Sequence, residues 1–224
     1  SSGEHAFDHD ALLVQLDLVQ VGEEEAHLHG DGPVLRGRTQ KEGSGILDGR
    51  AVHSVRAYPS VSDIPGPVDL AVVVVPKEHV VEVVRECGEK GVRGVVVISA
   101  GFKEVGQEGA ERELQLAEVC RCFGMRLVGP NCMGLLSTEE GVSLNATFAP
   151  TMPPPGPSSF MSQSGALGVT ILDYAAELGM GIRHFASVGN KADVSGNDLI
   201  EYWADDPGTR VIAGASHDTP SAVA

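Results

Sequence analysis

Aromatic and basic residues are scarce in this chain of 224 residues. Phe, Trp and Tyr make up 4%, and 16 Lys and Arg residues face 31 Asp and Glu residues, for a net charge of −15. This sign opposes binding to a phosphate backbone, so nucleic-acid binding is disfavoured as the main function. No run of 18 apolar residues occurs, so we expect no membrane span.

Cysteine is also sparse, and its four positions form neither a CxxC pair nor a zinc-binding spacing. They are Cys87, Cys120, Cys122 and Cys132. Scattered thiols fit a reducing compartment better than a disulfide framework. The first residues show no basic segment followed by an apolar run, so we expect no secretory signal. The histidines gathered in residues 1–54 lack a helical or strand period that would group them. We therefore expect a cytoplasmic protein without a metal site of its own.

The remaining sequence alternates between expected strands and helices. The expected strands are residues 69–75, 94–99, 125–128, 159–161, 182–187 and 211–212, and the expected helices are residues 78–90, 107–123, 165–178 and 198–204. This alternation predicts an α/β fold with parallel sheets. Four prolines within residues 151–158 argue against a helix or a central strand there, so we place a domain boundary at that segment.

The first 54 residues do not share this alternation. An apolar stretch at residues 11–21 fits a strand or a short helix, and its periodicity does not decide between them. Residues 30–49 are rich in turn-forming residues and predict a loop. The resulting division has an atypical N-terminal segment (1–54), a first domain (55–150) and a second domain (151–224).

Short loops with glycine or proline follow the three expected strands of the first domain, at residues 75–77, 99–102 and 129–132. In doubly wound sheets, ligands bind outside the carboxyl ends of the strands. One such loop usually only turns the chain, but three at one sheet edge favour a ligand cleft. Within the third loop, Cys132 has no base nearby in sequence, so a packed thiol is favoured over a nucleophile.

In the second domain, residues 162–165 join an expected strand to an expected helix. Ser162 or Ser164 can cap that helix, whose N-terminal N–H groups and dipole would suit a phosphate. No GxxxxGK[ST] motif occurs, and the turn lacks the first glycine of GxSxG. Neither a Walker-type nucleotide site nor a serine hydrolase is therefore expected.

After the next expected strand, Lys191 could meet a phosphate, and Asp193 could accept a proton or orient a loop. The alternative is a polar turn in which Ser195 or Asn197 caps the following helix. His184 lies within an apolar strand and is interpreted as a core or edge residue rather than a ligand.

Several blocks recur here in a distinctive order and spacing. They are YPSV (58–61), PVDLAVVVVP (67–76), GVVVISAG (94–101), GPNCMG (129–134), SQSGAL (162–167), SVGNKAD (187–193), DL (198–199) and DDP (205–207). Over roughly residues 55–212, the chain thereby resembles the ADP-forming acyl-CoA synthetases, relatives of the α subunit of succinyl-CoA synthetase. The resemblance implies a Rossmann-like CoA-binding domain followed by a flavodoxin-like domain.

The resemblance also implies site residues. CoA would lie across the strand ends of the first domain, at Val75, Pro76, Ser99, Ala100, Gly101, Asn131 and Cys132. A phosphohistidine loop would be received at Ser162, Gln163, Ser164 and Gly165. No catalytic residue is assigned.

In this family a carboxylic acid is joined to CoA while ATP becomes ADP and phosphate, through an acyl phosphate and a phosphohistidine. The resemblance therefore implies CoA and a small carboxylic acid as ligands. ATP, ADP and Mg would bind an ATP-grasp domain or a β subunit, to which no residue here corresponds. Two alternatives remain open: a regulatory CoA- or ligand-binding module of a protein acetyltransferase, and an inactive fragment.

Both ends depart from the family pattern. The family opens with a strand and a glycine-rich turn that holds the CoA phosphates, and we expect both to be absent from residues 1–54. Ser216 and His217 resemble the family's serine–histidine pair, but the glycine and helix that should follow are missing. We therefore expect weak CoA affinity and hypothesise that residues 1–54 and 213–224 derive from a shifted reading frame.

Overall fold

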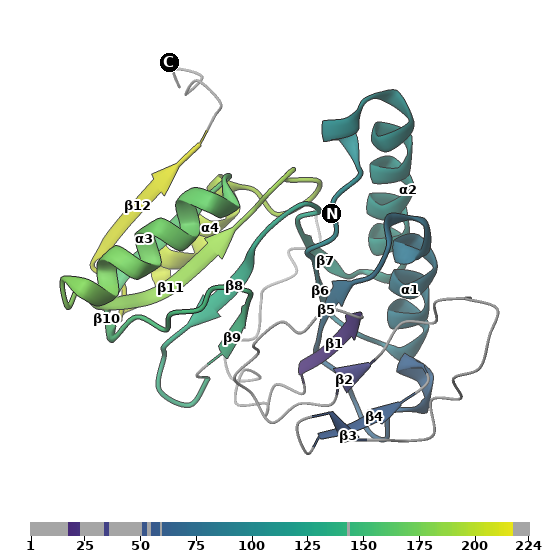
Figure 1. Ribbon diagram of the computed structural model, residues 1–224, viewed down its shortest axis with the longest axis horizontal. Coiled ribbons are helices and arrows are strands. Elements are labelled where there is room, and N and C mark those ends of the chain that lie inside the picture. The colour runs from purple at the N-terminus through teal and green to yellow at the C-terminus, as the bar shows by residue number, and fades with distance from the viewer. Residues whose placement is uncertain are drawn as a thin grey trace, which may run out of the picture.

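The computed structural model describes residues 18–22, 34–35, 51–52, 55–58, 60–142 and 144–216, which form two α/β units (Figure 1). The strands described for the first sheet are β1 (Leu18–Gly22), β2 (Val34–Leu35), β3 (Ala51–Val52), β4 (Val55–Tyr58), β5 (Leu70–Val74), β6 (Gly94–Val97) and β7 (Arg126–Val128). They lie in the order β3-β4-β2-β1-β5-β6-β7. Every neighbouring pair runs parallel except β3 and β4.

The helices of this unit are α1 (Lys77–Lys90) and α2 (Gln107–Phe123), with the short 3-10 helices η2 (Val61–Asp63) and η3 (Lys103–Val105). The sequence predicted α1 to within one residue and α2 without error. Each helix ends at a glycine in the left-handed region, Gly91 at φ 88° and Gly124 at φ 68°, where other residues are strained.

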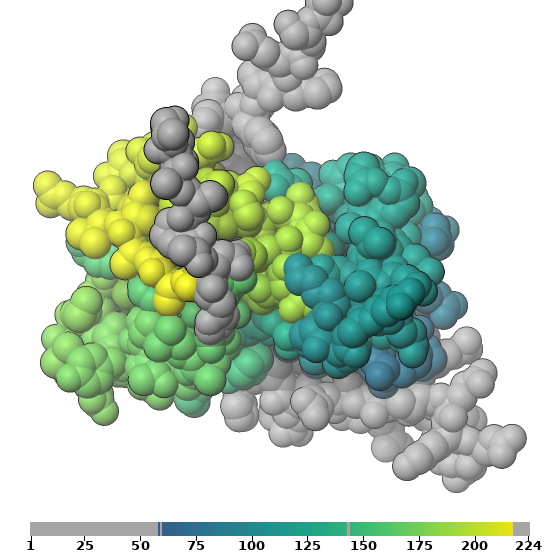
Figure 2. Space-filling view, turned by 90° about the horizontal axis from the view of Figure 1, so that it is seen from above, coloured from purple at the N-terminus to yellow at the C-terminus, as the bar shows by residue number. Residues whose placement is uncertain are grey.

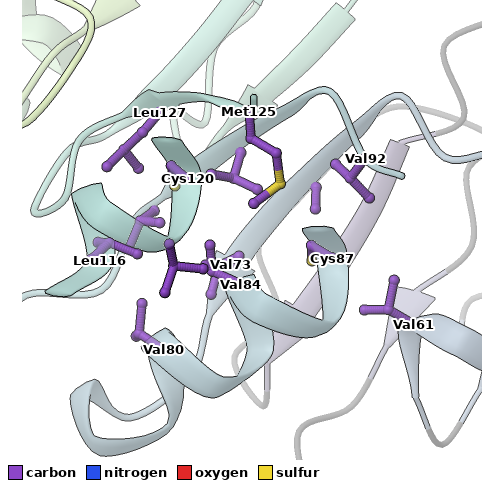
Figure 3. Packing of buried hydrophobic residues seen from close by; sticks show 14 of the residues in the cluster. Val61, Val73, Val80, Val84, Cys87, Val92, Leu116, Cys120, Met125 and Leu127 are labelled. Carbon is purple, nitrogen blue, oxygen red and sulfur yellow. The ribbon is translucent and has the colours of Figure 1, made fainter. Parts of the chain in front are cut away.

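One face of the first sheet is covered by α1 and α2. Val73 of β5 packs with Val80 and Val84 of α1 and with Leu116 of α2 in a single buried cluster (Figure 3). The opposite face is covered differently. Val72, Val96 and Val128 of β5, β6 and β7 belong to a second buried cluster that includes Ala146 and Val194 of the other unit. The two units therefore share a core.

The strands described for the second sheet are β8 (Gly134–Ser137), β9 (Leu144–Thr147), β10 (Pro155–Ser162), β11 (Ile182–Ser187) and β12 (Val211–Ala215), in the order β12-β10-β11-β8-β9. β10 runs parallel to both of its neighbours, whereas β8 runs antiparallel to β11 and to β9. This sheet is therefore mixed, where the sequence predicted a parallel one.

The helices of the second unit are α3 (Gly165–Glu177) and α4 (Gly196–Asp205). Phe185 of β11 belongs to the buried cluster that contains Leu172 of α3. Its neighbour His184 stacks instead on Trp203 of α4, with ring centroids 6.3 Å apart. Because successive strand residues point to opposite faces, α3 and α4 cover opposite faces of the sheet.

The absence of a first strand, expected from the sequence, is wrong. β1 lies within residues 1–54 and pairs with β5 over five residues, in the interior of the sheet. β1 contains the end of the apolar stretch at residues 11–21, for which the sequence left a strand and a short helix open, and the structure shows the strand. The glycine-rich turn expected to be missing lies outside the described residues, and the shifted reading frame stays a hypothesis.

The exclusion of a central strand from the proline-rich segment is also wrong, because β10 begins at Pro155 between β11 and β12. Pro155 and Ser158 both pair with Ile182, so the intervening residues form a bulge. A bulge takes positions out of the hydrogen-bond ladder, which removes the penalty for a missing proline N–H.

The domain boundary predicted after residue 150 stays a prediction. In the described structure, the chain changes from the first sheet to the second between β7 and β8, and β9 also precedes the predicted boundary. Among the described residues, no helix is long and apolar enough to cross a membrane.

Candidate functional site

Ser99 connects the carboxyl ends of β5 and β6 with the loop after β7. Its Oγ accepts from Val75 N at 3.1 Å and donates to Val75 O at 2.6 Å. Its carbonyl oxygen accepts from Asn131 N at 3.0 Å. The structure therefore brings together residues from the three loops that the sequence placed at one sheet edge.

The loop after β6 is shaped by Gly101, which has φ 101°. A Cβ at this position would overlap the side chain of Lys77, so glycine allows that side chain to cross the loop. Pro76 precedes α1, and both Pro76 and Ala100 are exposed. These small side chains leave the backbone at this edge open to close approach by a ligand.

Cys132 turns its thiol inward instead. It is buried, and its Sγ lies 3.3 Å from Val97 O. Burial raises the pKa of this thiol to about 12, so it remains protonated at neutral pH. The interpretation as a packed thiol is confirmed, while Asn131 next to it is exposed.

The turn between β10 and α3 has the structure expected of a capped helix start. Ser164 is the N-cap, and its Oγ accepts from Leu167 N at 3.4 Å. Ser162 Oγ accepts from Ser164 N at 3.1 Å and donates to Ser164 O at 2.8 Å. Gln163 N donates to Ala215 O of β12, which anchors the turn to the neighbouring strand. Binding of a phosphohistidine loop at residues 162–165 stays a prediction.

The segment after β11 lies along the carboxyl end of β7. Ala192 N donates to Gly129 O and Val194 N donates to Leu127 O, both at 3.0 Å. Asp193 Oδ2 accepts from Leu127 N at 2.8 Å and from Arg126 Nε at 3.0 Å. Asp193 therefore orients this loop, one of the two roles predicted for it. A phosphate contact of Lys191 stays a prediction.

Ser195 caps α4, as predicted, and does so in a capping box with Asp198. Hydrogen bonds from Ser195, with Arg126 as a further partner, lower the pKa of Asp198 to about 2. Arg126 Nη2 lies 3.1 Å from Asp198 Oδ1 and therefore joins β7 to α4 across the two units.

The sequence did not assign a role to three polar residues near the first site: Glu104, Glu113 and Asn190. Glu113 lies among the buried positions of α2, which include Gly109 and Leu116. A carboxylate on the apolar face of an expected helix is the signal that could have identified it.

The interpretation of His184 as a core residue is confirmed. It is buried against Trp203, and burial lowers its pKa despite Asp206 Oδ2 at 3.3 Å. Within the part of the chain that the structure describes, no group of His, Cys, Asp and Glu residues could hold a metal ion. His217 lies outside the described residues.

Comparisons with known proteins agree with this arrangement of two units. Residues 47–138 match a family described as CoA binding domain. Residues 155–219 match a family described as succinyl-CoA ligase like flavodoxin domain.

Among curated relatives, the α subunit of acetate–CoA ligase [ADP-forming] II from Pyrococcus furiosus is 49% identical over 162 residues, covering 72% of this chain and 35% of the relative. Acetate–CoA ligase [ADP-forming] from Methanocaldococcus jannaschii is 45% identical over 161 residues, covering 72% of this chain and 22% of the relative. The chain thus spans about a third or less of these relatives' length.

A solved structure is similar as well. Dinucleotide-forming acetyl-coenzyme A synthetase 1 from Ca. Korarchaeum cryptofilum in its apo form matches with a TM-score of 0.76 and 34% identity, over 92% of this chain and 45% of that protein. The sequence blocks, both domain matches and the shared fold lead to one conclusion: this chain belongs to the ADP-forming acetyl-CoA synthetase α-subunit family, which is related to succinyl-CoA ligase.

Proposed function

We propose that this chain provides the CoA-binding part of an ADP-forming acetate–CoA ligase. The observation that carries the proposal is the meeting of three loops at the carboxyl edge of β5, β6 and β7, joined by Ser99. These loops contain the sequence blocks shared with the family. Their exposed residues Pro76, Ala100 and Asn131 are the surface that CoA would contact.

The other components come from elsewhere in the proposed enzyme. An ATP-grasp domain or a β subunit would bind ATP, ADP and Mg, and the small carboxylic acid would be acetate, as the names of the relatives suggest. The turn at residues 162–165 would receive the phosphohistidine loop, with Ser164 fixing the start of α3. The four free thiols suit a reducing compartment such as the cytoplasm.

Calorimetric titration of the purified chain with CoA tests this proposal. Ala100→Leu places a larger side chain at the exposed centre of the site and should weaken CoA binding at least tenfold. Ala204→Leu, at an exposed position of α4, is the matched control and should bind like the wild-type chain. Failure of the wild-type chain to bind CoA, or equal binding by both variants, would contradict the proposed site.

A second measurement separates the enzyme from the regulatory module. The chain is mixed with the ATP-grasp β subunit of a related ligase, acetate, CoA and ATP, and formation of ADP and acetyl-CoA is followed. Product formation that depends on this chain supports the ligase. CoA binding without product formation would favour the regulatory module or an inactive fragment instead.

A further inference from the structure

The side chain of Asn190 crosses from the second unit to the first and lies between two carboxylates. Its Nδ2 donates to Glu104 Oε2 at 2.6 Å and to Glu113 Oε2 at 2.8 Å. Its Oδ1 accepts from Asn131 Nδ2 at 3.4 Å. Asn190 and Glu113 are each only 8% exposed. Both hydrogens of the amide are therefore used, and its oxygen contacts one of the predicted CoA-binding loops.

Glu104 transmits this contact to the second CoA-binding loop. Its Oε1 accepts from Gly101 N at 2.5 Å and from Phe102 N at 3.1 Å. One carboxylate group thus holds Asn190 with one oxygen and the backbone of the loop after β6 with the other. Any displacement of Glu104 would move the N–H groups of Gly101 and Phe102 with it.

Glu113 and Lys103 complete the network. Glu113 Oε1 lies 3.1 Å from Lys103 Nζ, and Glu113 Oε2 accepts from Lys103 N at 3.3 Å. Lys103 Nζ also donates to the backbone oxygen of Asn190. The backbone N–H of Asn190 in turn donates to Pro130 O at 2.9 Å. Asn190 is therefore held to the first unit by both its side chain and its backbone.

The two carboxyl groups accept from the same nitrogen, so the amide of Asn190 is the donor that lies between them. Burial by itself would raise the pKa of Glu104, but hydrogen bonds from Asn190, Gly101 and Phe102 outweigh it and lower that pKa. Glu104 is therefore ionised at neutral pH. Removing the amide of Asn190 would drive Glu104 away from Glu113 and distort the loop that Glu104 holds.

We propose that Asn190 is a positioning residue that sets the geometry of the CoA-binding loops from the second unit. This inference rests on the proposed function. Asn190 acts through Glu104 and Asn131, and the second unit thereby controls CoA affinity in the first. Because such coupling is reciprocal, bound CoA should stabilise the contact of Asn190 with the first unit by the same free energy by which that contact strengthens CoA binding.

The test compares CoA titrations of the wild-type chain, Asn190→Ala and the exposed control Asn197→Ala. Asn190→Ala should raise the dissociation constant about tenfold at unchanged stoichiometry, and Asn197→Ala should change neither quantity. The stoichiometry of binding reports the fraction of folded, binding-competent molecules. If Asn190 only supported folding, its loss would lower this stoichiometry and leave the dissociation constant unchanged. That result, or unchanged binding by Asn190→Ala, would overturn the inference.

A swapped pair keeps the test informative even if Asn190→Ala does not fold. Asn190→Asp places a third carboxylate beside Glu104 and Glu113 and should weaken CoA binding further. The double variant Asn190→Asp with Glu104→Gln places the amide donor at position 104 and the carboxylate acceptor at position 190. The hydrogen bond between the two positions can then form again, and part of the CoA affinity should return. Absence of recovery would overturn the role of this contact, whereas no CoA binding by the wild-type chain would overturn the proposed function itself.

Discussion

The two faces of the first sheet are built from the same kind of residue but are covered from different parts of the chain. Val73 packs with α1 and α2, the helices that directly follow β5 and β6 (Figure 3). Val95 belongs to the same buried cluster. Val72 and Val96, their neighbours in sequence, pack instead with Ala146 and Val194. In the space-filling view, the segment after β11 lies directly against the first unit (Figure 2).

This difference shows why the candidate site belongs to both units. The helix-covered face needs only local connections, whereas the other face stays exposed until the second unit packs on it. The same contact places Asn190 between Glu104 and Glu113, at the edge where CoA is proposed to bind. Changes at the two faces should therefore affect stability and CoA binding differently.

The largest loss is expected on the helix-covered face. Leu116→Ala leaves a cavity at a side chain with 0% exposure and should lower the free energy of unfolding by about 4 kcal/mol. Leu114→Ala on the same helix removes a side chain that is 71% exposed and is the matched control. Urea denaturation measures both variants, and an equal loss in the two would contradict the packing of α2.

A glycine substitution tests the contact between the units. Gly189 has φ 51°, and a Cβ there would overlap the carbonyl oxygens of Pro130 and Asn131. Gly179 has φ 65° with nothing within 4 Å, so Gly179→Ala isolates the backbone strain of about 1 kcal/mol. Gly189→Ala should cost roughly 2 kcal/mol more, because the overlap forces the loop off β7. Equal melting temperatures of the two variants would argue against this close contact.

Neighbouring valines of β6 compare the two faces directly. Val95→Ala and Val96→Ala each remove a fully buried side chain and should each cost about 2 kcal/mol. Only Val96→Ala loosens the face covered by the second unit, so it alone should speed amide hydrogen exchange at residues 190–194. Faster exchange in the Val95→Ala variant as well would mean that the two faces are not independent.

The smallest effect concerns pH. Asp198 has a folded-state pKa of about 2 against an ordinary 3.8, so its stabilising contribution is present above that ordinary value and is lost as pH falls towards 2. Because this side chain is 42% exposed, solvent screening limits the contribution to about 1 kcal/mol. Asp198→Asn should flatten the acid side of the stability curve measured by urea denaturation at several pH values, and an unchanged slope would contradict the prediction.

Some elements could be predicted from sequence because their signals are local. The bounds of α2 follow from its apolar period and from Gly124, and β11 was predicted over its full length of Ile182–Ser187. β8 and β9 were missed: β8 joins the sheet through β11, about fifty residues further along the chain, and β9 joins it through β8. Short strands without a continuous apolar run carry little information about such pairing.

The candidate site divides in the same way. Strand ends followed by small residues identified the loops of Ser99 and Asn131, because parallel strands bring their carboxyl ends to one edge. The network of Asn190 was not predictable as a whole: the position of Glu113 on the apolar face of its helix is a signal, but nothing in the sequence connects Glu113 with Glu104 or Asn190. Their meeting with Asn190 requires residues more than seventy positions apart to become neighbours.

The sequence by itself determined the α/β alternation, the ends of α1 and α2 to within one residue, the family and the edge at which a ligand is expected. These features depend on residue periodicity and on glycine and proline chemistry within a short stretch of chain. Only the tertiary structure decided which residues cover the second face of the first sheet and which donor separates the two carboxylates. Both are long-range contacts that form only once the two units have packed together. Burial of apolar surface stabilises the first, and hydrogen bonds from the amide of Asn190 to the two carboxyl groups stabilise the second.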